Sequence, residues 1–161
     1  MDLRAKAIDI RKDIVNLIYH AGTGHIGGDL SVTDILVDLY YKQMNVGPDK
    51  VQDPERDRFV LSKGHCVEAL YTILADKGFF PKEELQTYSQ YLSKFIGHPN
   101  NKIAGVEVNS GSLGHGLAVG VGMALAAKMD QRAYRTYVVL GDGECDEGSV
   151  WEGAMAGPQY G

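Results

Sequence analysis

The sequence has little cysteine, no long hydrophobic run and no excess of basic charge. Its 161 residues include only 2 cysteines, and neither has the spacing of a metal-binding pair or of a disulfide framework. The first residues form no apolar signal region, and no stretch approaches membrane-spanning length. The net charge of −5 argues against a nucleic-acid-binding surface. These absences favour a reducing compartment, with the cytoplasm as the default location, and no nucleic acid or membrane as partner.

Glycine, by contrast, is abundant and clustered. The 20 glycines gather around His25, His65, His115 and Asp142. Clustered glycine indicates backbone positions that something approaches closely. The other proportions, 44% hydrophobic and 23% charged, are those of an ordinary globular protein, and the length predicts a single domain over residues 1–161.

Residues 135–144 contain the most informative pattern of the chain, a predicted strand followed by a glycine turn. Residues 137–140 are an apolar run that predicts a buried parallel strand. The run ends in Gly141-Asp142-Gly143, and a helix is expected from about 147 to 160. Such a turn presents backbone N–H groups to a phosphate, and Asp142 can hold a divalent cation. From these residues alone a plain strand–helix turn is the alternative, and the P-loop and dinucleotide fingerprints are both missing.

Hydrophobic spacing predicts the other elements. A second strand is expected at 58–62, and it is followed, like the first, by a glycine turn and a helix. A second helix is expected after a glycine-rich loop at 21–28, with Ser31 as its cap and Asp34 at the capping-box position. The remaining expectations are helices over 3–18, from 67 to about 78 and from 81, and an irregular segment over 88–109.

The apolar helix expected over 116–129 contains three glycines, Gly116, Gly120 and Gly122. Each interior glycine costs about 1 kcal/mol relative to alanine, so this helix is expected to pack very closely, against another helix or an oligomer partner. Together the elements predict an α/β fold in which helices flank a parallel sheet and sites lie at the strand C-termini. Because two strands leave a parallel sheet poorly covered, and the sequence stops at Gly161, we expect more chain or a partner to complete it.

Five motifs in this sequence also occur, in the same order, in the transketolase family. Over nearly its whole length the chain resembles the amino-terminal, thiamine-diphosphate-binding module of transketolases, and the resemblance therefore implies that fold. The motifs are Thr23–Gly28 (S-G-H-P-G in the family), Arg58–His65 (R-F-V-L-S-x-G-H), Gly97–Pro99, Gly111–Gly116 (G-P-L-G-Q-G) and Gly141–Gly143 with Glu147-Gly148. Ile26 and Ser112 stand where proline is usual, which puts loop rigidity in doubt.

The resemblance implies a role for each matching residue. Asp142 would bind Mg²⁺ or Ca²⁺, while His25 and His98 would hydrogen-bond substrate hydroxyls and move protons. Glu147 would join an acid network between two sites. Thiamine diphosphate would be bound by His65, which would also reach the reacting centre, and by Gly111, Ser112, Leu113, Gly141 and Gly143. His115 stands where the family has glutamine and receives no role, and His20 is interpreted as a helix-end residue.

The implied activity is the transfer of a two-carbon ketol unit from a ketose phosphate to an aldose phosphate, as in the pentose phosphate pathway. The cofactor would supply the electron sink. The family's second metal ligand, an asparagine, lies beyond Gly161, and the carboxylate that activates the aminopyrimidine belongs to a separate module. We therefore predict that this chain alone is inactive and needs a complementary C-terminal module or subunit, in a homodimer or heterotetramer.

Two other classes of function remain open. The first is another thiamine-diphosphate enzyme, similar to deoxyxylulose-phosphate synthase or to a dehydrogenase E1 subunit, although Arg58–His65 and Glu147-Gly148 favour transketolase. The second is a cofactor-binding or assembly module without turnover of its own. Adding the complementary module would discriminate between them. The sugar itself is not predicted by the sequence.

Overall fold

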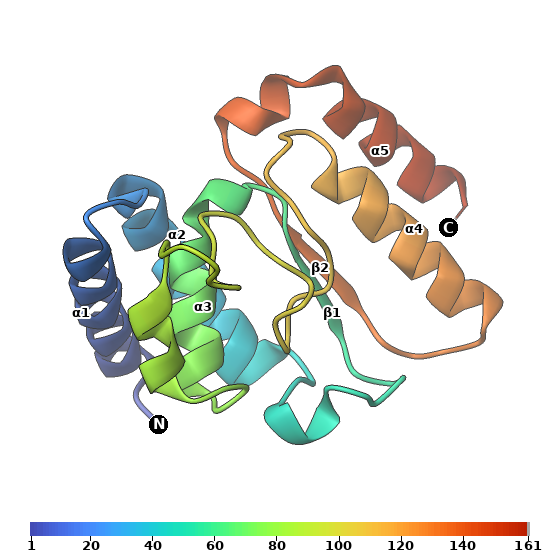
Figure 1. Cartoon of the computed structure of the whole chain (residues 1–161). Helices are drawn as coiled ribbons and strands as arrows, with labels where there is room; N and C mark the ends of the chain where they lie inside the picture. The colour runs from blue at the N-terminus through green and yellow to red at the C-terminus, as the bar shows by residue number, and fades with distance from the viewer. Residues whose placement is uncertain (161) are drawn as a thin grey trace.

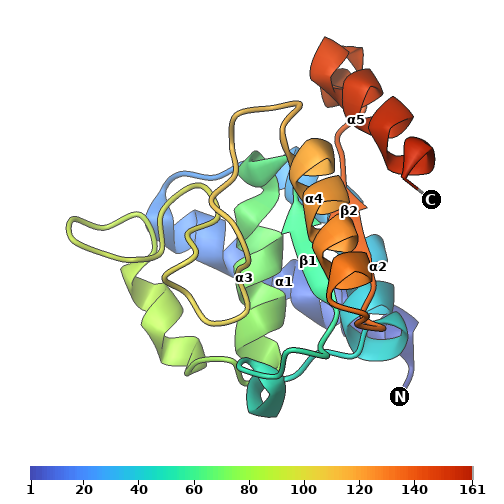
Figure 2. The same ribbon diagram turned by 90° about the vertical axis from the view of Figure 1, so that its right-hand side faces the viewer.

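A two-stranded parallel sheet lies between two groups of helices in the computed structural model, which describes residues 1–160 (Figure 1). Helices α1 to α3 lie on one side of the sheet, and α4 and α5 lie on the other (Figures 1 and 2). This arrangement confirms the predicted α/β class. The elements are α1 (Leu3–Ala21), α2 (Ile26–Asp38), η1 (Leu39–Gln43), η2 (Pro48–Lys50), β1 (Arg58–Leu61), η3 (Gly64–Cys66), α3 (Val67–Asp76), η4 (Lys82–Thr87), α4 (Gly116–Met129), β2 (Thr136–Val139), η5 (Gly143–Asp146) and α5 (Gly148–Gln159).

The two faces of the sheet pack against different helices. Phe59 pairs with Tyr137 in the parallel register, and both pack into the main core with α1, α2 and α3. Successive side chains of a strand point to opposite faces, so Val60 and Val138 point the other way. There Val138 meets Gly120 of α4. Both predicted strands are confirmed, and both run in the same direction.

Helix α1 has a cap at each end. The Asp2 carboxylate accepts hydrogen bonds from the backbone N–H groups of Arg4, at 2.9 Å, and Ala5, at 3.4 Å. At the other end Gly22 adopts φ of 67° and donates its N–H to Ile18 O at 2.9 Å. Glycine suits this left-handed C-terminal position because it has no Cβ. The predicted first helix is confirmed and extends to Ala21.

The prediction for the start of the second helix was wrong. Helix α2 begins at Ile26, so Gly27 and Gly28 are helical and only the segment from Gly22 to His25 is loop. Ser31 lies inside the helix, where its hydroxyl donates to Gly28 O at 2.9 Å instead of capping. Asp34 pairs with Arg11 of α1 at 2.5 Å. Burial of α2 against α1 and α3 outweighs the low helix propensity of two glycines.

The close packing predicted for α4 is confirmed, and it is mostly packing against the sheet. A Cβ at Gly116 would overlap Ser62, which follows β1, and one at Gly120 would overlap Val138 of β2. The other helix in contact is α5, whose Gly153 approaches α4 so closely that a Cβ there would lie 3.3 Å from Ala118 N. A Cβ at Gly122 would meet nothing within 4 Å. The expectation of an oligomer contact therefore rests on the outer face of α4 and stays a prediction.

The segment 88–109 contains no helix or strand, as predicted. It is held by its own apolar side chains. Phe95 and Ile103 are 1% and 2% exposed, and the Phe95 ring packs edge-on against Tyr71 with centroids 5.4 Å apart. None of the helices within residues 1–160 has both the length and the hydrophobicity needed to cross a lipid bilayer.

Candidate functional site

Three segments meet where the C-terminal ends of β1 and β2 lie side by side. They are Ser62–Cys66, Ser110–Gly116 and Gly141–Glu147. A Cβ at Gly64 would lie 2.8 Å from the backbone of Ser110 and Gly111. The Ser110 hydroxyl donates a hydrogen bond, at 2.6 Å, to the carbonyl oxygen of Leu61, which is the last residue of β1. Polar groups from distant parts of the chain are therefore brought to one edge of the sheet, as the sequence predicted.

The Glu144 carboxylate ties these segments together. It is 2% exposed and accepts hydrogen bonds from the N–H groups of Gly114, at 2.8 Å, and Gly141, at 3.0 Å. The hydroxyl of Ser62 also donates to it. Sequence analysis gave Glu144 no role, because an acidic residue after Gly-Asp-Gly resembles a surface residue until its partners are known.

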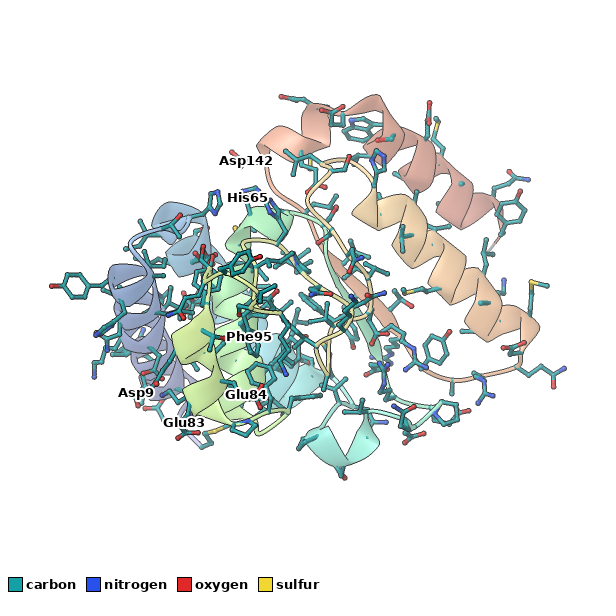
Figure 3. All side chains as sticks on the ribbon, in the orientation of Figure 1. Asp9, His65, Glu83, Glu84, Phe95 and Asp142 are labelled. Atoms are coloured by element: carbon teal, nitrogen blue, oxygen red, sulfur yellow. The ribbon has the colours of Figure 1, made fainter. Side chains whose placement is uncertain are left out.

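The three histidines of the sequence prediction form one cluster. His25 directly precedes α2, His65 lies in η3, and His98 lies in the irregular segment. The ring of His25 is 5.6 Å from that of His65 and 6.3 Å from that of His98, between centroids. Figure 3 shows His65 and Asp142 at the same end of the molecule. The cluster is open to solvent on the side where His25 and His98 are exposed.

Two contacts fix the position of His98. Its carbonyl oxygen accepts a hydrogen bond from the buried Tyr71 hydroxyl at 2.9 Å. Its ring packs on Gly111, where a Cβ would lie 2.6 Å from His98 Cδ2. Gly111 also has φ of 138°, a conformation that glycine tolerates and other residues rarely adopt. The predicted cofactor-lining glycine thus contacts a predicted substrate-binding histidine.

The surroundings of His65 favour its neutral form. Burial lowers the pKa of His65, and the neighbouring His25, Lys63 and His98 lower this pKa further. A neutral imidazole can donate from one nitrogen and accept at the other. Lys63 is a basic residue that sequence analysis left without a role, and its stem lies 3.6 Å from the Cβ position of Gly141.

The turn after β2 has the chemistry of an anion and cation site. The Asp142 side chain is exposed, and a Cβ at Gly143 would meet nothing within 4 Å, so a ligand can approach this backbone. Helix α5 begins only at Gly148, because η5 intervenes. Within residues 1–160, no group of three or more His, Cys, Asp or Glu is arranged to hold a metal ion. In the described part, Asp142 could therefore offer a single carboxylate to a cation at this turn.

The other predicted site residues border the same edge. Glu147 is the residue before α5, and a Cβ at Gly114 would lie 2.9 Å from Glu147 Cβ. Ser112 and Leu113 are exposed on the loop that crosses the strand ends. His115 is also exposed, with Nδ1 3.2 Å from Leu113 O, and His20 lies in the last turn of α1.

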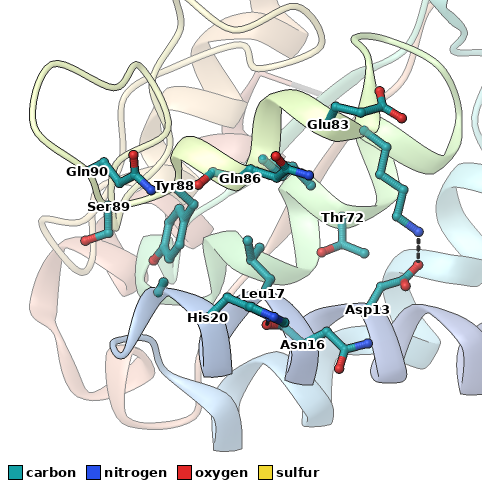
Figure 4. Close-up of a pocket in the computed structure, with 13 residues that line it drawn as sticks. Asp13, Asn16, Leu17, His20, Thr72, Glu83, Gln86, Tyr88, Ser89 and Gln90 are labelled. Carbon is teal, nitrogen blue, oxygen red and sulfur yellow. Dashed lines mark hydrogen bonds and ion pairs between the residues drawn. The ribbon is translucent and has the colours of Figure 1, made fainter.

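A well-defined pocket lies elsewhere, between α1, α3 and η4 (Figure 4). It measures about 710 Å³, and two of its lining residues, Asp13 and Lys82, form an ion pair at 2.6 Å. None of the predicted cofactor or substrate residues lines it. The candidate site is instead the open edge of the sheet, where the titratable groups converge.

Comparison with known proteins identifies the family. A family model for the thiamine diphosphate-binding domain of transketolase matches residues 3–159. The chain belongs to the transketolase family. An apulose-4-phosphate transketolase subunit from Phocaeicola vulgatus is 57% identical over 93% of this chain and 53% of its own length. The 6-deoxy-6-sulfo-D-fructose transketolase subunit SqwG of a Clostridium species is 44% identical over 96% and 57%.

Solved transketolase structures share the fold. The transketolase of Leishmania mexicana superposes with a TM-score of 0.88 at 30% identity, over 95% of this chain and 25% of that one. The enzyme of Campylobacter jejuni gives 0.88 at 34% identity, over 98% and 26%. This chain thus spans about half of the transketolase subunits that it matches and about a quarter of these structures.

Proposed function

We propose that this chain is the thiamine diphosphate- and divalent-metal-binding part of a transketolase. The reaction is the transfer of a two-carbon ketol unit from a ketose phosphate to an aldose phosphate. The observation that carries this proposal is the convergence of three histidines with the Gly141–Gly143 turn at one edge of the sheet. A diphosphate site alone would not need the histidine cluster, whereas a sugar with several hydroxyls would use it.

Each residue has a task in this proposal. Asp142 would hold Mg²⁺ or Ca²⁺ against the diphosphate, and Gly143 would let the diphosphate approach the backbone. Gly111, Ser112 and Leu113 would line the cofactor, with Gly141 at the other side. Bound thiamine diphosphate supplies the electron sink. His25 and His98 would orient sugar hydroxyls and move protons, while neutral His65 would accept or donate a proton beside the cofactor.

The proposal includes a partner. The carboxylate that activates the aminopyrimidine is expected on a complementary transketolase module, and Glu147 is proposed to meet the acid network at that interface. Three relatives carry names that describe them as a subunit of a transketolase, which supports a two-subunit enzyme. The proposed assembly is a homodimer or a heterotetramer. The two unpaired cysteines support a reducing compartment such as the cytoplasm.

The names of the relatives suggest the first substrates to test. Two of them are apulose-4-phosphate transketolase subunits, and the relative of 57% identity is one of these. We therefore propose apulose-4-phosphate ahead of 6-deoxy-6-sulfo-D-fructose and of the common pentose and hexose phosphates.

The test is ketol transfer by the complete protein with its complementary subunit, thiamine diphosphate and Mg²⁺. We expect turnover of a ketose phosphate only when both subunits are present, and a fall in kcat/KM of about 10² or more for His25→Gln. His20→Gln, at the end of α1, is the matched control. Cofactor binding without turnover would instead support a non-catalytic module, and turnover of 2-oxo acids would support a dehydrogenase-like subunit.

A further inference from the structure

Two carboxyl groups lie buried behind the histidine cluster. Asp29 is in the first turn of α2, and Glu68 is in the first turn of α3. Both are 0% exposed, and they are close neighbours, because Asp29 accepts the backbone N–H of Ala69, the residue after Glu68. Neither residue belongs to a motif of the sequence analysis. Acidic side chains are almost never fully buried without a partner.

One oxygen of each carboxyl group has an ordinary partner. Asp29 Oδ1 accepts the Ala69 N–H at 3.0 Å, and Glu68 Oε1 accepts the Tyr88 hydroxyl at 2.6 Å. The remaining oxygens, Asp29 Oδ2 and Glu68 Oε2, are buried without any such partner. Two buried carboxylates in contact cannot both be charged, and one proton between these two oxygens would satisfy both.

The surroundings agree with one shared proton. Burial and the charge of Glu68 raise the pKa of Asp29 to about 8, against the opposing effects of the Ala69 N–H and Lys63. The buried Cys66, Tyr71 and Tyr88 beside the pair stay uncharged below pH 8, because burial raises the pKa of Cys66 to about 11 and raises those of Tyr71 and Tyr88 as well. The pair therefore carries a single negative charge near neutral pH.

That charge faces His25. Glu68 Oε1 lies 3.9 Å from His25 Nδ1, and a Cβ at the intervening Gly24 would lie 2.7 Å from the same oxygen. At this distance the two groups attract each other electrostatically but are too far apart for a hydrogen bond. Such distances often shorten when the substrate binds. A carboxylate beside one ring nitrogen selects the tautomer with the proton on that nitrogen and leaves the other nitrogen free.

We propose that Asp29 and Glu68 share one proton and, as a singly charged pair, are the positioning residues that hold His25 with Nδ1–H toward Glu68 and Nε2 toward the sugar. Asp29 carries the proton and Glu68 carries the charge. The part of this inference that concerns the sugar rests on the proposed function, whereas the proton sharing and the tautomer do not.

Asp29→Asn and Glu68→Gln form a matched pair of tests in the complete protein. Each replaces one carboxyl group by an amide of the same shape that can donate to the remaining carboxylate. Asp29→Asn leaves the charge on Glu68, beside His25, and Glu68→Gln moves it to Asp29. We expect NMR of ¹⁵N-labelled histidine to show the Nδ1–H tautomer of His25 in wild type and Asp29→Asn, and a smaller fraction in Glu68→Gln. Equal fractions in both variants would overturn the positioning role.

Thermal unfolding tests the shared proton without any assay of activity. Folded wild type holds a proton on Asp29 that the unfolded chain releases above about pH 4. The melting temperature of Asp29→Asn should therefore exceed that of wild type by a margin that widens from pH 5 to pH 8. Asp9→Asn, an exposed carboxyl group on α1, is the control and should show a constant margin. A constant margin for Asp29→Asn would contradict the shared proton.

Kinetics connect the pair to the reaction. Glu68→Gln should lower kcat/KM by about tenfold, the smaller end of the effect of removing the carboxylate partner of a functional histidine. It should lower kcat/KM more than Asp29→Asn does. If the protein proves to have no ketol transfer activity, the proposed function is wrong, while the tautomer and unfolding results still decide the pair.

Discussion

Glu144 shows how one buried carboxylate joins the loops of a site to the sheet. Its two oxygens accept from Gly114, Gly141 and Ser62, which belong to three separate segments. Backbone N–H groups in such loops would otherwise be left without acceptors. The positions of the Gly-Asp-Gly turn and of the 111–116 loop relative to each other therefore depend on this side chain.

We expect Glu144→Gln to destabilise the protein by about 1–3 kcal/mol. The amide NH₂ group would face a backbone N–H or the Ser62 hydroxyl where an acceptor is needed, and a buried polar group would lose its partner. Urea unfolding at neutral pH measures the change. Glu152→Gln, an exposed residue of α5, is the control and should change stability by less than about 0.5 kcal/mol.

Asp142 is the opposite case, an exposed carboxylate whose proposed role is in binding. We expect Asp142→Asn to leave stability unchanged and to weaken Mg²⁺-dependent binding of thiamine diphosphate by about tenfold or more, about 1.4 kcal/mol. The single tryptophan gives the readout, since Trp151 Nε1 donates to Cys145 O of η5 at 2.9 Å. A titration of Trp151 fluorescence with cofactor, with and without Mg²⁺, measures the affinity.

Asp146→Asn is the control for this titration, because Asp146 is also exposed and lies four residues along the chain, on η5. Its affinity for thiamine diphosphate should stay that of wild type. An equal loss in both variants would show that general negative charge, and not the position of Asp142, matters. That result would remove Asp142 as the metal ligand.

At the scale of elements, α4 shows glycine used for close approach. Gly120 faces Val138 of β2, whereas a Cβ at Gly122 would enter open space. Gly120→Ala should therefore destabilise the protein by about 1–3 kcal/mol through overpacking. Gly122→Ala should stabilise it by about 1 kcal/mol, the difference in helix propensity. Equilibrium unfolding of both variants checks the opposite signs.

Gly122→Ala also tests the predicted oligomer contact. If the outer face of α4 meets a partner at Gly122, the added methyl group will weaken assembly while the chain itself becomes more stable. Sedimentation of the variant with and without its complementary subunit separates the two effects. Unchanged assembly would place the partner on another face.

The sequence predicted elements well where hydrophobic spacing and glycine turns agree. Both strands, the helix of α1 and the helix of α4 were found this way, because one buried face governs their pattern. The start of α2 was missed, since tertiary burial made two glycines helical where local propensity indicates a loop. Ser31 and Asp34 matched a capping box by spacing, although their partners lie inside α2 and on α1.

The candidate site was predictable in part. The three histidines lie in glycine-rich motifs. The two parallel strands bring the motif of His65 and the Gly141–Gly143 turn to one edge of the sheet, and the order of strands and turns in the sequence indicates this. Glu144 and the pair of Asp29 and Glu68 were not predictable, because burial and long-range partners define them. Asp29 and Glu68 are separated by 39 positions in the chain and meet only when α2 packs on α3.

In the whole molecule, different carboxyl groups change the stability of the fold in opposite directions as the pH changes. Ion pairs hold α1 against its neighbours: Lys6 with Asp76 at 2.9 Å and Arg11 with Asp34 at 2.5 Å. Hydrogen bonds from Tyr41 and Lys6 lower the pKa of Asp76 despite its partial burial, and the hydrogen bond from Arg11 lowers that of Asp34. Stability from these two groups is present above the unfolded pKa of about 4 and is lost as the pH falls below it.

Asp29 acts in the other direction. Its folded pKa of about 8 lies above the unfolded value, so its contribution is greatest below about pH 4 and is lost as the pH rises toward 8. The two effects together place the stability maximum of the protein on the acid side of neutrality, at about pH 4–6. Melting temperatures measured from pH 3 to pH 9 at constant ionic strength should show this maximum.

Two variants show which residue causes the fall in melting temperature on each side of that maximum. Asp29→Asn should flatten the fall between pH 5 and pH 8 and move the maximum toward neutral pH. Asp76→Asn should reduce the loss of stability below pH 4, since the ion pair with Lys6 is then absent at every pH. Wild-type stability that does not fall relative to that of Asp29→Asn between pH 5 and pH 8 would mean that Asp29 is ionised in the folded protein.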